Sequence, residues 1–185
     1  MNDTTAPGRV AHPDPAKMSD RQQALYDQML AGPYGPLGPR MLLIHDPDLY
    51  DAWVQMSDTL LKNDIQERNR KLAILVIARH WTAQLEWWVH SREAIKAGID
   101  PEVIAAIREN RTPDLLKADE RAIYNFAREL CCDRTVSDKT YAAARNILGD
   151  TALVQFTVFM GQYTNVAMML VAHQLGLPEG VENPL

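Results

Sequence analysis

The stretch from Lys71 to Gly98 restricts the possible folds more than any other part of the chain. Its first half repeats apolar residues at the three- and four-residue spacing of one helix face, at Leu72, Leu75 and Val76. The pattern predicts a helix that ends near Trp81, a second helix capped by Thr82, and a C-terminal stop for that second helix at Gly98. Two consecutive helices therefore form the centre of the expected fold.

Capping signals divide most of the remaining chain into further helices. Two segments fit the capping box and two fit an aspartate N-cap followed by proline, namely Ser19 with Gln22, Asp64 with Glu67, Asp46-Pro47 and Asp100-Pro101. The predicted helices cover residues 19–31, 46–62, 64–80, 82–98, 100–108, 117–132, 138–148 and 151–175. Because no alternating strand pattern of useful length occurs, the predicted fold class is all-α, a compact bundle of about seven to eight helices.

Length and loop composition predict one domain with a short arm. A chain of 185 residues can bury a full core without a metal or a disulfide. We predict an arm without regular structure over residues 1–17, which contain three prolines, and a single helical domain over residues 18–185. The segment Gly32–Arg40 holds three glycines and three prolines, which exclude both a helix and a central strand. We interpret this segment as a connector rather than as a pocket wall.

The last predicted helix, residues 151–175, has apolar side chains on nearly every face. The helix is interrupted by Gln155, Gln162, Thr164, Asn165 and His173, whereas a membrane-spanning helix needs about 20 mainly apolar residues. We therefore predict a helix buried on all sides, either in the core or in a subunit contact. Gln162 and Tyr163 on this helix are plausible donors to a pocket, and core polar groups with partners inside the protein are an equally good interpretation.

Charge and cysteine content indicate the compartment and the partners. The net charge of −5 and the pI near 5.5 argue against nucleic acid and anionic membranes as partners. The two cysteines, Cys131 and Cys132, are neighbours, and one such pair cannot form a disulfide framework of a secreted protein. No secretory signal is visible at the N-terminus. These observations predict a cytoplasmic protein without a membrane partner.

Glu86 and His90 form the only tight pairing of a histidine with a carboxylate in the sequence. On a helix, a spacing of four residues places two Cβ atoms about 5–6 Å apart, so the carboxylate can hold and tune the imidazole. The spacing alone fits a plain surface pair equally well, but the nearby Trp81, Trp87 and Trp88 indicate an apolar wall. We therefore predict acid–base chemistry at this pair. Glu93 lies one turn further on and is expected to be a solvated side chain.

Other kinds of site find little support. Di-iron bundles use a Glu-x-x-His motif on two helices, and no histidine here has a glutamate three residues before it. HExxH, GxSxG, the P-loop and GxGxxG are all absent from the sequence. We predict neither a metal nor a cofactor. The cysteines end a predicted helix far in sequence from His90, which does not favour thiol chemistry.

These motifs together resemble a known family. The segments ILVIARHW, LEWWVH and REAIKAGI look like the core of the carboxymuconolactone decarboxylase and alkylhydroperoxidase-D-like superfamily. HDPDLYDAWVQMSDTLL before them, and DERAIYNFAREL, VSD and GQYTNVAMML after them, resemble the longer decarboxylase-like members. The resemblance implies an all-α fold and assembly into trimers or hexamers through the core helices.

The resemblance also separates two branches of the superfamily. The peroxidase branch has a Cys-x-x-Cys motif, a histidine four residues later and a glutamate one helix earlier. These positions fall at Ala83, Glu86, His90 and Lys71, so only the histidine is retained. Peroxidase chemistry by that route needs two thiols, which this chain lacks there. The decarboxylase branch is similar at both Glu86 and His90.

The resemblance implies a cofactor-independent lyase or isomerase that acts on a small carboxylated compound, expected to be cyclic. His90 is the predicted acid–base group and Glu86 its orienting partner. The predicted substrate-binding residues are Trp87, Tyr163, Gln162, Arg79 and Lys71. Two alternatives remain: a non-catalytic oligomeric protein that binds a small molecule on the same scaffold, and an atypical alkylhydroperoxidase-like antioxidant protein that would need Cys131 or Cys132 within reach of His90.

Overall fold

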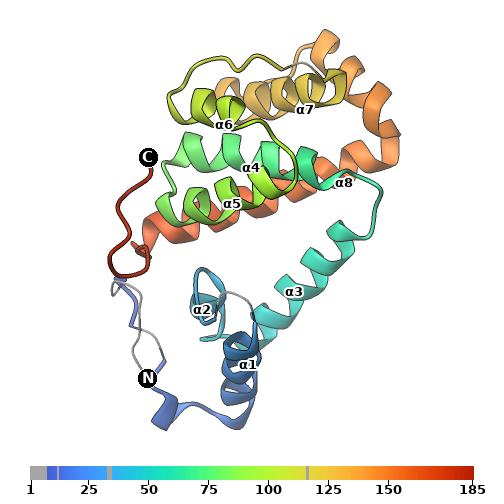
Figure 1. The fold of residues 1–185 in the computed structure, drawn as a ribbon. Helices are drawn as coiled ribbons and strands as arrows, with labels where there is room; N and C mark the ends of the chain where they lie inside the picture. The colour runs from blue at the N-terminus through green and yellow to red at the C-terminus, as the bar shows by residue number, and fades with distance from the viewer. Residues whose placement is uncertain (1–7, 12, 33–34, 116) are drawn as a thin grey trace.

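The computed structural model describes residues 8–11, 13–32, 35–115 and 117–185, and in these residues it contains eight α-helices and no strand. The helices are α1 (Asp20–Ala31), α2 (Arg40–Leu43), α3 (Pro47–Leu61), α4 (Glu67–Trp81), α5 (Gln84–Lys96), α6 (Pro101–Arg108), α7 (Ala118–Arg128) and α8 (Asp138–Ala172) (Figure 1). A 3-10 turn, Pro15–Lys17, and a π-helical turn, Glu129–Asp133, complete the regular structure. The predicted all-α class is confirmed.

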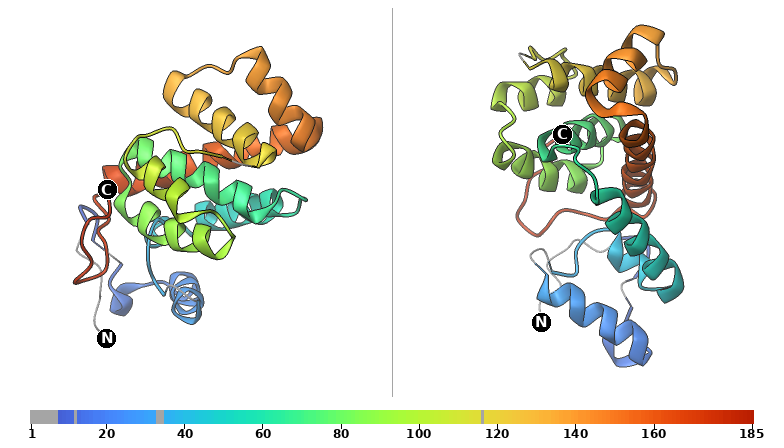
Figure 2. Two further views of the ribbon diagram at one scale, coloured as in Figure 1. Left: turned by 45° about the horizontal axis from the view of Figure 1, so that its top comes forward. Right: turned by 90° about the vertical axis from the view of Figure 1, so that its right-hand side faces the viewer.

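Helix α4 lies at the centre of the larger apolar core. Every residue from Leu72 to Ala78 is buried, so this part of the helix has no face toward solvent. It packs against α5, α7 and α8, which surround it in both views of Figure 2. A helix that is apolar on all sides needs neighbours on all sides, and α4 therefore organises the bundle.

A second, smaller apolar cluster holds the N-terminal helices together. It consists of Leu25, Met29, Met41, Leu43, Ile44 and Tyr50, and Met169 of α8 packs against it. These residues belong to α1, α2, α3 and the turn between α2 and α3, at the opposite end of the molecule from α6 and α7 (Figure 1). The single-turn helix α2 was not predicted. Pro39 is its N-cap residue, and Arg40, the last residue of the segment predicted to be non-helical, is its first residue.

Most predicted helix starts are confirmed, and two are wrong. Ser19 forms the complete capping box with Gln22, and Asp100 accepts a hydrogen bond from the backbone N–H of Glu102. Asp64 does not cap α4, because the side chain of Asn63 accepts the N–H of Ile65 at 3.1 Å and the helix starts three residues after Asp64. Thr82 does not cap α5.

Thr82 instead ends α4 in the left-handed conformation, with φ of 52°. Ala83 is then the N-cap residue of α5 and offers no side-chain hydrogen bond. The expected C-terminal stop at the other end of α5 is present: Gly98 has φ of +85°, a conformation that glycine adopts without strain.

Asp46 caps α3 as predicted, and its removal offers a direct test of the capping energy. Its carboxylate accepts the backbone N–H groups of Asp48 and Leu49, each at 3.1 Å. We expect Asp46→Ala to lower the free energy of unfolding by roughly 0.5–2 kcal/mol, because these N–H groups lose their acceptor. Urea denaturation followed by circular dichroism measures the change. Asp58→Ala, an exposed aspartate on the same helix, is the control, and equal losses in both variants would contradict the assignment.

Helix α8 contains the last two predicted helices, joined across a break. Gly149 has φ of 75° and ψ of 169°, which is not helical, and it separates residues 138–148 from the long C-terminal part. An L-residue with a side chain rarely adopts this φ. The two predicted helices are therefore real segments, although they follow each other without a loop.

The outer face of α8 is exposed in the single chain, contrary to the expectation of a helix buried on all sides. Val154 is 65% exposed, and Val158, Met168 and Val171 are also exposed. The alternative of a subunit contact therefore applies to this face, and assembly into a homo-oligomer stays a prediction. Within the described part of the chain, no helix combines the length and the apolar character needed to cross a membrane.

The predicted arm is only partly within the described residues, since residues 1–7 and 12 lie outside them. Residues 15–17, expected to be irregular, form the 3-10 turn, which Asp14 caps. Arg9 lies on the end of α8, where its backbone N–H donates to the carbonyl oxygen of His173 at 2.7 Å.

Candidate functional site

A cavity of about 490 Å³ lies where the two apolar clusters meet. Helices α5 and α8 supply one side, and α1, α3 and the segment before α2 supply the other. The polar and charged residues that line it are Gln28, Arg40, Ser57, Glu86, His90, Glu93, Gln162 and Tyr163. Most of the remaining lining is apolar, including Met29, Trp53, Leu85 and Phe159, so a small organic molecule fits the site better than a free polar ion.

Glu86 is the most unusual residue of this cavity. It lies in the first turn of α5 and is only 2% exposed. Neither carboxyl oxygen has a hydrogen-bond partner within the described part of the chain. Burial raises the pKa of this carboxyl well above its ordinary value, because the charged form would lose its water. The group is thus held toward its protonated form, with its oxygens available to a ligand.

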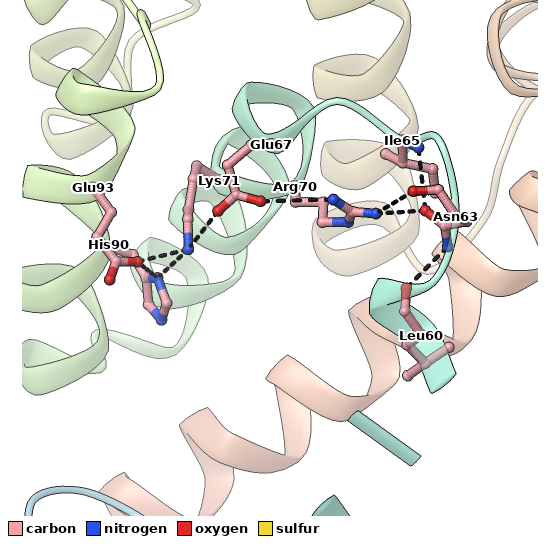
Figure 3. A network of polar contacts seen from close by, with 8 residues as sticks. All are labelled: Leu60, Asn63, Ile65, Glu67, Arg70, Lys71, His90 and Glu93. Atoms are coloured by element: carbon pink, nitrogen blue, oxygen red, sulfur yellow. Dashed lines mark hydrogen bonds and ion pairs between the residues drawn. The ribbon is translucent and has the colours of Figure 1, made fainter. Parts of the chain in front are cut away.

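His90 is held by a different acid from the one predicted. Its Nδ1 lies 3.0 Å from Oε2 of Glu93, one turn further along α5. Lys71 of α4 binds the same Oε2 at 2.6 Å and lies 3.4 Å from Nδ1 (Figure 3). Since a carboxylate only accepts, Nδ1 carries the proton in the neutral ring, and Nε2 keeps its lone pair.

Two predictions about α5 are therefore wrong. Glu86 does not orient His90 by a hydrogen bond, because the described structure gives its oxygens no partner. Glu93 is not simply a solvated side chain, since it binds both His90 and Lys71. Lys71 explains the difference: its ammonium group holds Glu93 beside the imidazole, and this contact comes from another helix, which the spacing along α5 does not reveal.

The surroundings of His90 favour its neutral form. Burial lowers its pKa, the hydrogen bond to Glu93 acts in the opposite direction, and the charge of Lys71 lowers it further. The net pKa is below the ordinary histidine value. Near neutral pH, His90 is thus an uncharged base, and burial holds Glu86 on the same helix toward its protonated form.

A chain of ion pairs and hydrogen bonds leads from the Lys71–Glu93 pair, next to His90, away from the cavity. Lys71 also binds Glu67 at 3.1 Å, and Glu67 lies 3.6 Å from Arg70. Arg70 in turn donates to the Oδ1 of Asn63 at 2.5 Å (Figure 3). This chain of contacts ties the position of Glu93 to the turn between α3 and α4.

Gln162 and Tyr163 both line the cavity from α8. The amide of Gln162 donates a hydrogen bond to Oγ of Ser57, which itself donates to the carbonyl oxygen of Trp53 at 2.9 Å. The ring of Tyr163 meets that of His90 edge to face, with centroids 5.3 Å apart. Burial raises the pKa of the Tyr163 phenol, so it remains a hydrogen-bond donor.

Three predicted substrate-binding residues do not line the cavity. Trp87 is 2% exposed and belongs to the larger apolar core. Arg79 donates from Nε to the carbonyl oxygen of Arg108 at 2.7 Å and lines a different, smaller cleft of about 280 Å³. The predicted Lys71 does not line the cavity either, but it acts on the cavity through Glu93 and His90.

The Gly/Pro segment is part of the cavity wall rather than only a connector. Its residues Gly35, Leu37, Gly38, Pro39 and Arg40 line the cavity, while Pro33 and Tyr34 lie outside the described residues. Gly38 has φ of +80°, which turns the chain into α2 and places Arg40 at the cavity. Apart from the position of Arg40 at the end of this loop, no sequence pattern indicated that it lines the cavity.

The two cysteines lie away from this cavity. Cys132 lines the smaller cleft together with Arg79 and His80, and neither cysteine lines the cavity that holds His90. Burial raises the pKa of Cys131 to about 12 and also raises that of Cys132. Both thiols are thus poor sources of thiolate.

Fold and site together define an all-α protein with a cavity that is lined by a buried carboxyl group and an imidazole. A family model for the "Carboxymuconolactone decarboxylase family" matches residues 47–129. No curated protein matches the sequence.

Solved structures share the fold at low sequence identity. An "uncharacterized peroxidase-related protein" from Ralstonia eutropha JMP134, described as an alkylhydroperoxidase AhpD core, has a TM-score of 0.75 at 16% identity over 95% of this chain and 94% of its own. An "uncharacterized peroxidase-related protein" from Silicibacter sp. TM1040 has a TM-score of 0.77 at 13% identity over 97% and 96%. A protein of unknown function from Agrobacterium tumefaciens has a TM-score of 0.66 at 17% identity over 76% and 97%.

Residues 47–129 are thus similar to the carboxymuconolactone decarboxylase family, and the chain shares its all-α fold with these AhpD-like structures. The matched residues contain α4 and α5 with Lys71, Glu86, His90 and Glu93. They contain α3 of the opposite wall of the cavity, but not α1, α2 or Arg40.

Proposed function

We propose that this protein is a cofactor-independent lyase or isomerase of the carboxymuconolactone decarboxylase-like type, which transfers protons to and from a small organic compound. The observation that carries the proposal is that Glu86 and His90 face one cavity while both carboxyl oxygens of Glu86 lack a partner in the described protein. A buried acid without a partner is costly, roughly 1–3 kcal/mol. Such a cost is typical of a group kept for chemistry.

The two groups supply complementary halves of a proton transfer. In an isomerisation, Nε2 of neutral His90 removes a proton from a carbon next to a carbonyl group, and the protonated Glu86 delivers one to another carbon. In a decarboxylation, the bond to the carboxylate breaks and its electron pair moves into the conjugated carbonyl. Glu86 then returns a proton to carbon, while the phenol of Tyr163 and the amide of Gln162 are donors for the enolate oxygen.

Glu93 and Lys71 act as positioning residues in this proposal. The Nδ1–H of His90 donates to Glu93, which fixes the tautomer with Nε2 as the base. Lys71 holds Glu93 from the neighbouring helix. This role replaces the orienting role that the sequence had suggested for Glu86.

A panel of muconolactone-type acids in deuterated buffer tests the proposal. We expect at least one compound to release carbon dioxide or to take up solvent deuterium at carbon, at a rate that His90→Ala removes. Binding of a compound to the cavity without carbon dioxide release or deuterium uptake by any member would instead support the non-catalytic binding role.

An antioxidant function of the alkylhydroperoxidase type is the second candidate. It is supported by the two similar structures that are described as peroxidase-related. The placement of the cysteines speaks against it, because Cys132 faces the other cleft and both thiols have raised pKa values.

Replacing both Cys131 and Cys132 by serine separates the two candidates. We expect the double variant to keep the turnover of the organic substrate within about twofold, since surface changes away from the site usually cost less than roughly 0.5 kcal/mol. Reduction of cumene hydroperoxide by the wild-type protein, with a loss of that activity in the double variant, would establish the antioxidant function instead.

A further inference from the structure

We propose that Arg40 selects the ligand by binding its one anionic group, so that the cavity takes monoanionic compounds with an apolar body and rejects dianions of the same size. The uncharged end of the compound would then reach Glu86 and His90, so the inference favours the isomerase form of the proposed function over loss of carbon dioxide beside Glu86. The identity of that reactive end rests on the proposed function, whereas the charge selection can be measured without any turnover.

The distribution of charged side chains around the cavity leaves Arg40 available to bind a ligand carboxylate. Arg40 is the one lysine or arginine among the described residues that line the cavity. The charge of Glu93 in the same lining is offset by Lys71, whose Nζ lies 2.6 Å from its Oε2. Arg40 forms no ion pair or hydrogen bond through its side chain with any described residue. A guanidinium without a carboxylate partner at the mouth of an apolar cavity is suited to a ligand carboxylate, which it can bind with two parallel hydrogen bonds.

The floor of the cavity explains why only one anionic group is accepted. Glu86 is buried and held toward its neutral form, His90 is neutral near pH 7, and Gln162 carries no charge. A second carboxylate at this end would be buried next to Glu86 without a cation that is free to pair with it. Burying an unpaired charge is far more costly than burying an uncharged polar group.

The position of Arg40 supports a role in selection rather than in catalysis. It lies on α2, whose entry is set by Gly38 with φ of +80°, on the wall opposite α5. Arg40 is itself exposed, so it can meet an incoming anion before the apolar body is buried. Arg40 itself lies outside the segment matched by the family model, whereas α3 of the same wall lies inside it.

Titrations with benzoate, benzamide and terephthalate test the inference by ¹H–¹⁵N NMR. Trp53 is the one tryptophan among the described residues that line the cavity. Its indole N–H signal, assigned by its loss in Trp53→Phe, therefore reports occupation of the cavity, and the other indole signals are internal references. We expect benzoate to shift the Trp53 signal at lower concentration than benzamide or terephthalate does. Arg40→Gln should weaken benzoate binding about tenfold, as expected for the loss of a hydrogen bond to a charged group, and leave benzamide unchanged.

Two further variants test whether the planar guanidinium matters and whether the effect is specific to the cavity. Arg40→Lys keeps the charge but not the planar fork, so benzoate binding should fall between wild type and Arg40→Gln. Arg145→Gln changes an exposed arginine on α8 that pairs with Asp150, and it should leave all three affinities unchanged.

Several outcomes would overturn the inference. These are equal binding of benzamide and benzoate, tighter binding of terephthalate than of benzoate, an unchanged benzoate affinity in Arg40→Gln, or no effect of benzoate on the Trp53 signal at millimolar concentration. None of them depends on proton transfer. Failure of the proposed function would appear separately, as absence of deuterium uptake in a protein that still discriminates benzoate from benzamide.

Discussion

Replacing His90 by glutamine is expected to lower turnover by about 10²–10⁴-fold, the usual contribution of a positioned acid–base group. Glutamine preserves approximate size and hydrogen-bonding capacity, so the fold should remain intact, but it cannot accept a proton at the position of Nε2. Steady-state rates on a substrate found in the panel, with circular dichroism as a check of folding, measure the effect. Turnover within twofold of wild type would remove His90 from the mechanism.

Glu93→Gln is the matched variant for the positioning role. The amide oxygen can still accept from Nδ1, but the negative charge that raises the pKa of His90 is gone while Lys71 continues to lower it. The pKa of His90 should therefore fall further. Because the base acts in its neutral form, activity is lost as pH falls through this pKa, and that acidic limb should move to lower pH in Glu93→Gln. An unmoved limb would mean that Glu93 has only a structural role.

Replacing Glu86 by leucine is expected to abolish turnover and, at the same time, to stabilise the fold. The carboxyl group is buried without a partner among the described residues, so its removal should raise the free energy of unfolding by roughly 1–3 kcal/mol. For a chain of this size, each kcal/mol corresponds to about 2–4 °C in Tm. Differential scanning calorimetry at pH 7 measures the shift.

Glu120→Leu is the control for this stability effect. Glu120 is also buried, but its carboxylate accepts from Lys117 at 2.8 Å and lies 3.4 Å from Arg68. Removing it takes this carboxylate from Lys117 and from the partly buried Arg68, so this variant should lose stability, although Arg68 keeps Asp119 as a partner. If both leucine variants lost stability to a similar degree, Glu86 would have to be a satisfied structural group.

The stabilisation of Glu86→Leu should also depend on pH, with a definite sign. The folded protein holds the proton on Glu86 more tightly than the unfolded chain does, because burial raises the pKa of this carboxyl. The wild type therefore loses stability as pH rises above about 4.3, the ordinary pKa of glutamate, and continues to lose it up to the raised pKa. The advantage of Glu86→Leu should be larger at pH 8 than at pH 5, and the contribution of His90, present in both proteins, cancels in the difference.

The fold was predictable because its signals are local. Asp46 and Ser19 cap helices through their own neighbours, Gly98 ends α5 with a positive φ, and the buried run in α4 is continuous in sequence. The predicted helix cap at Asp64 is wrong for an equally local reason, because the side chain of Asn63 accepts the N–H of Ile65.

The site was predictable only along one helix. Glu86 and His90 could be identified from their spacing and from the family resemblance, and Gln162 and Tyr163 from their polarity in an apolar helix. The partners of His90 could not, because Lys71 reaches Glu93 from α4. The prediction that Trp87 binds substrate was wrong, because the spacing of apolar residues does not show which face of a helix packs in the core and which lines a cavity.

The cavity is made of two parts that come from different stretches of sequence. Helix α5 carries the acid and the base and α8 carries Gln162 and Tyr163, whereas the part of the opposite wall that holds Arg40 is encoded before residue 47. Exchanging the first 46 residues between relatives would therefore graft a new recognition surface onto an unchanged reaction centre. Substrate range and chemistry can, by this architecture, diverge independently during evolution.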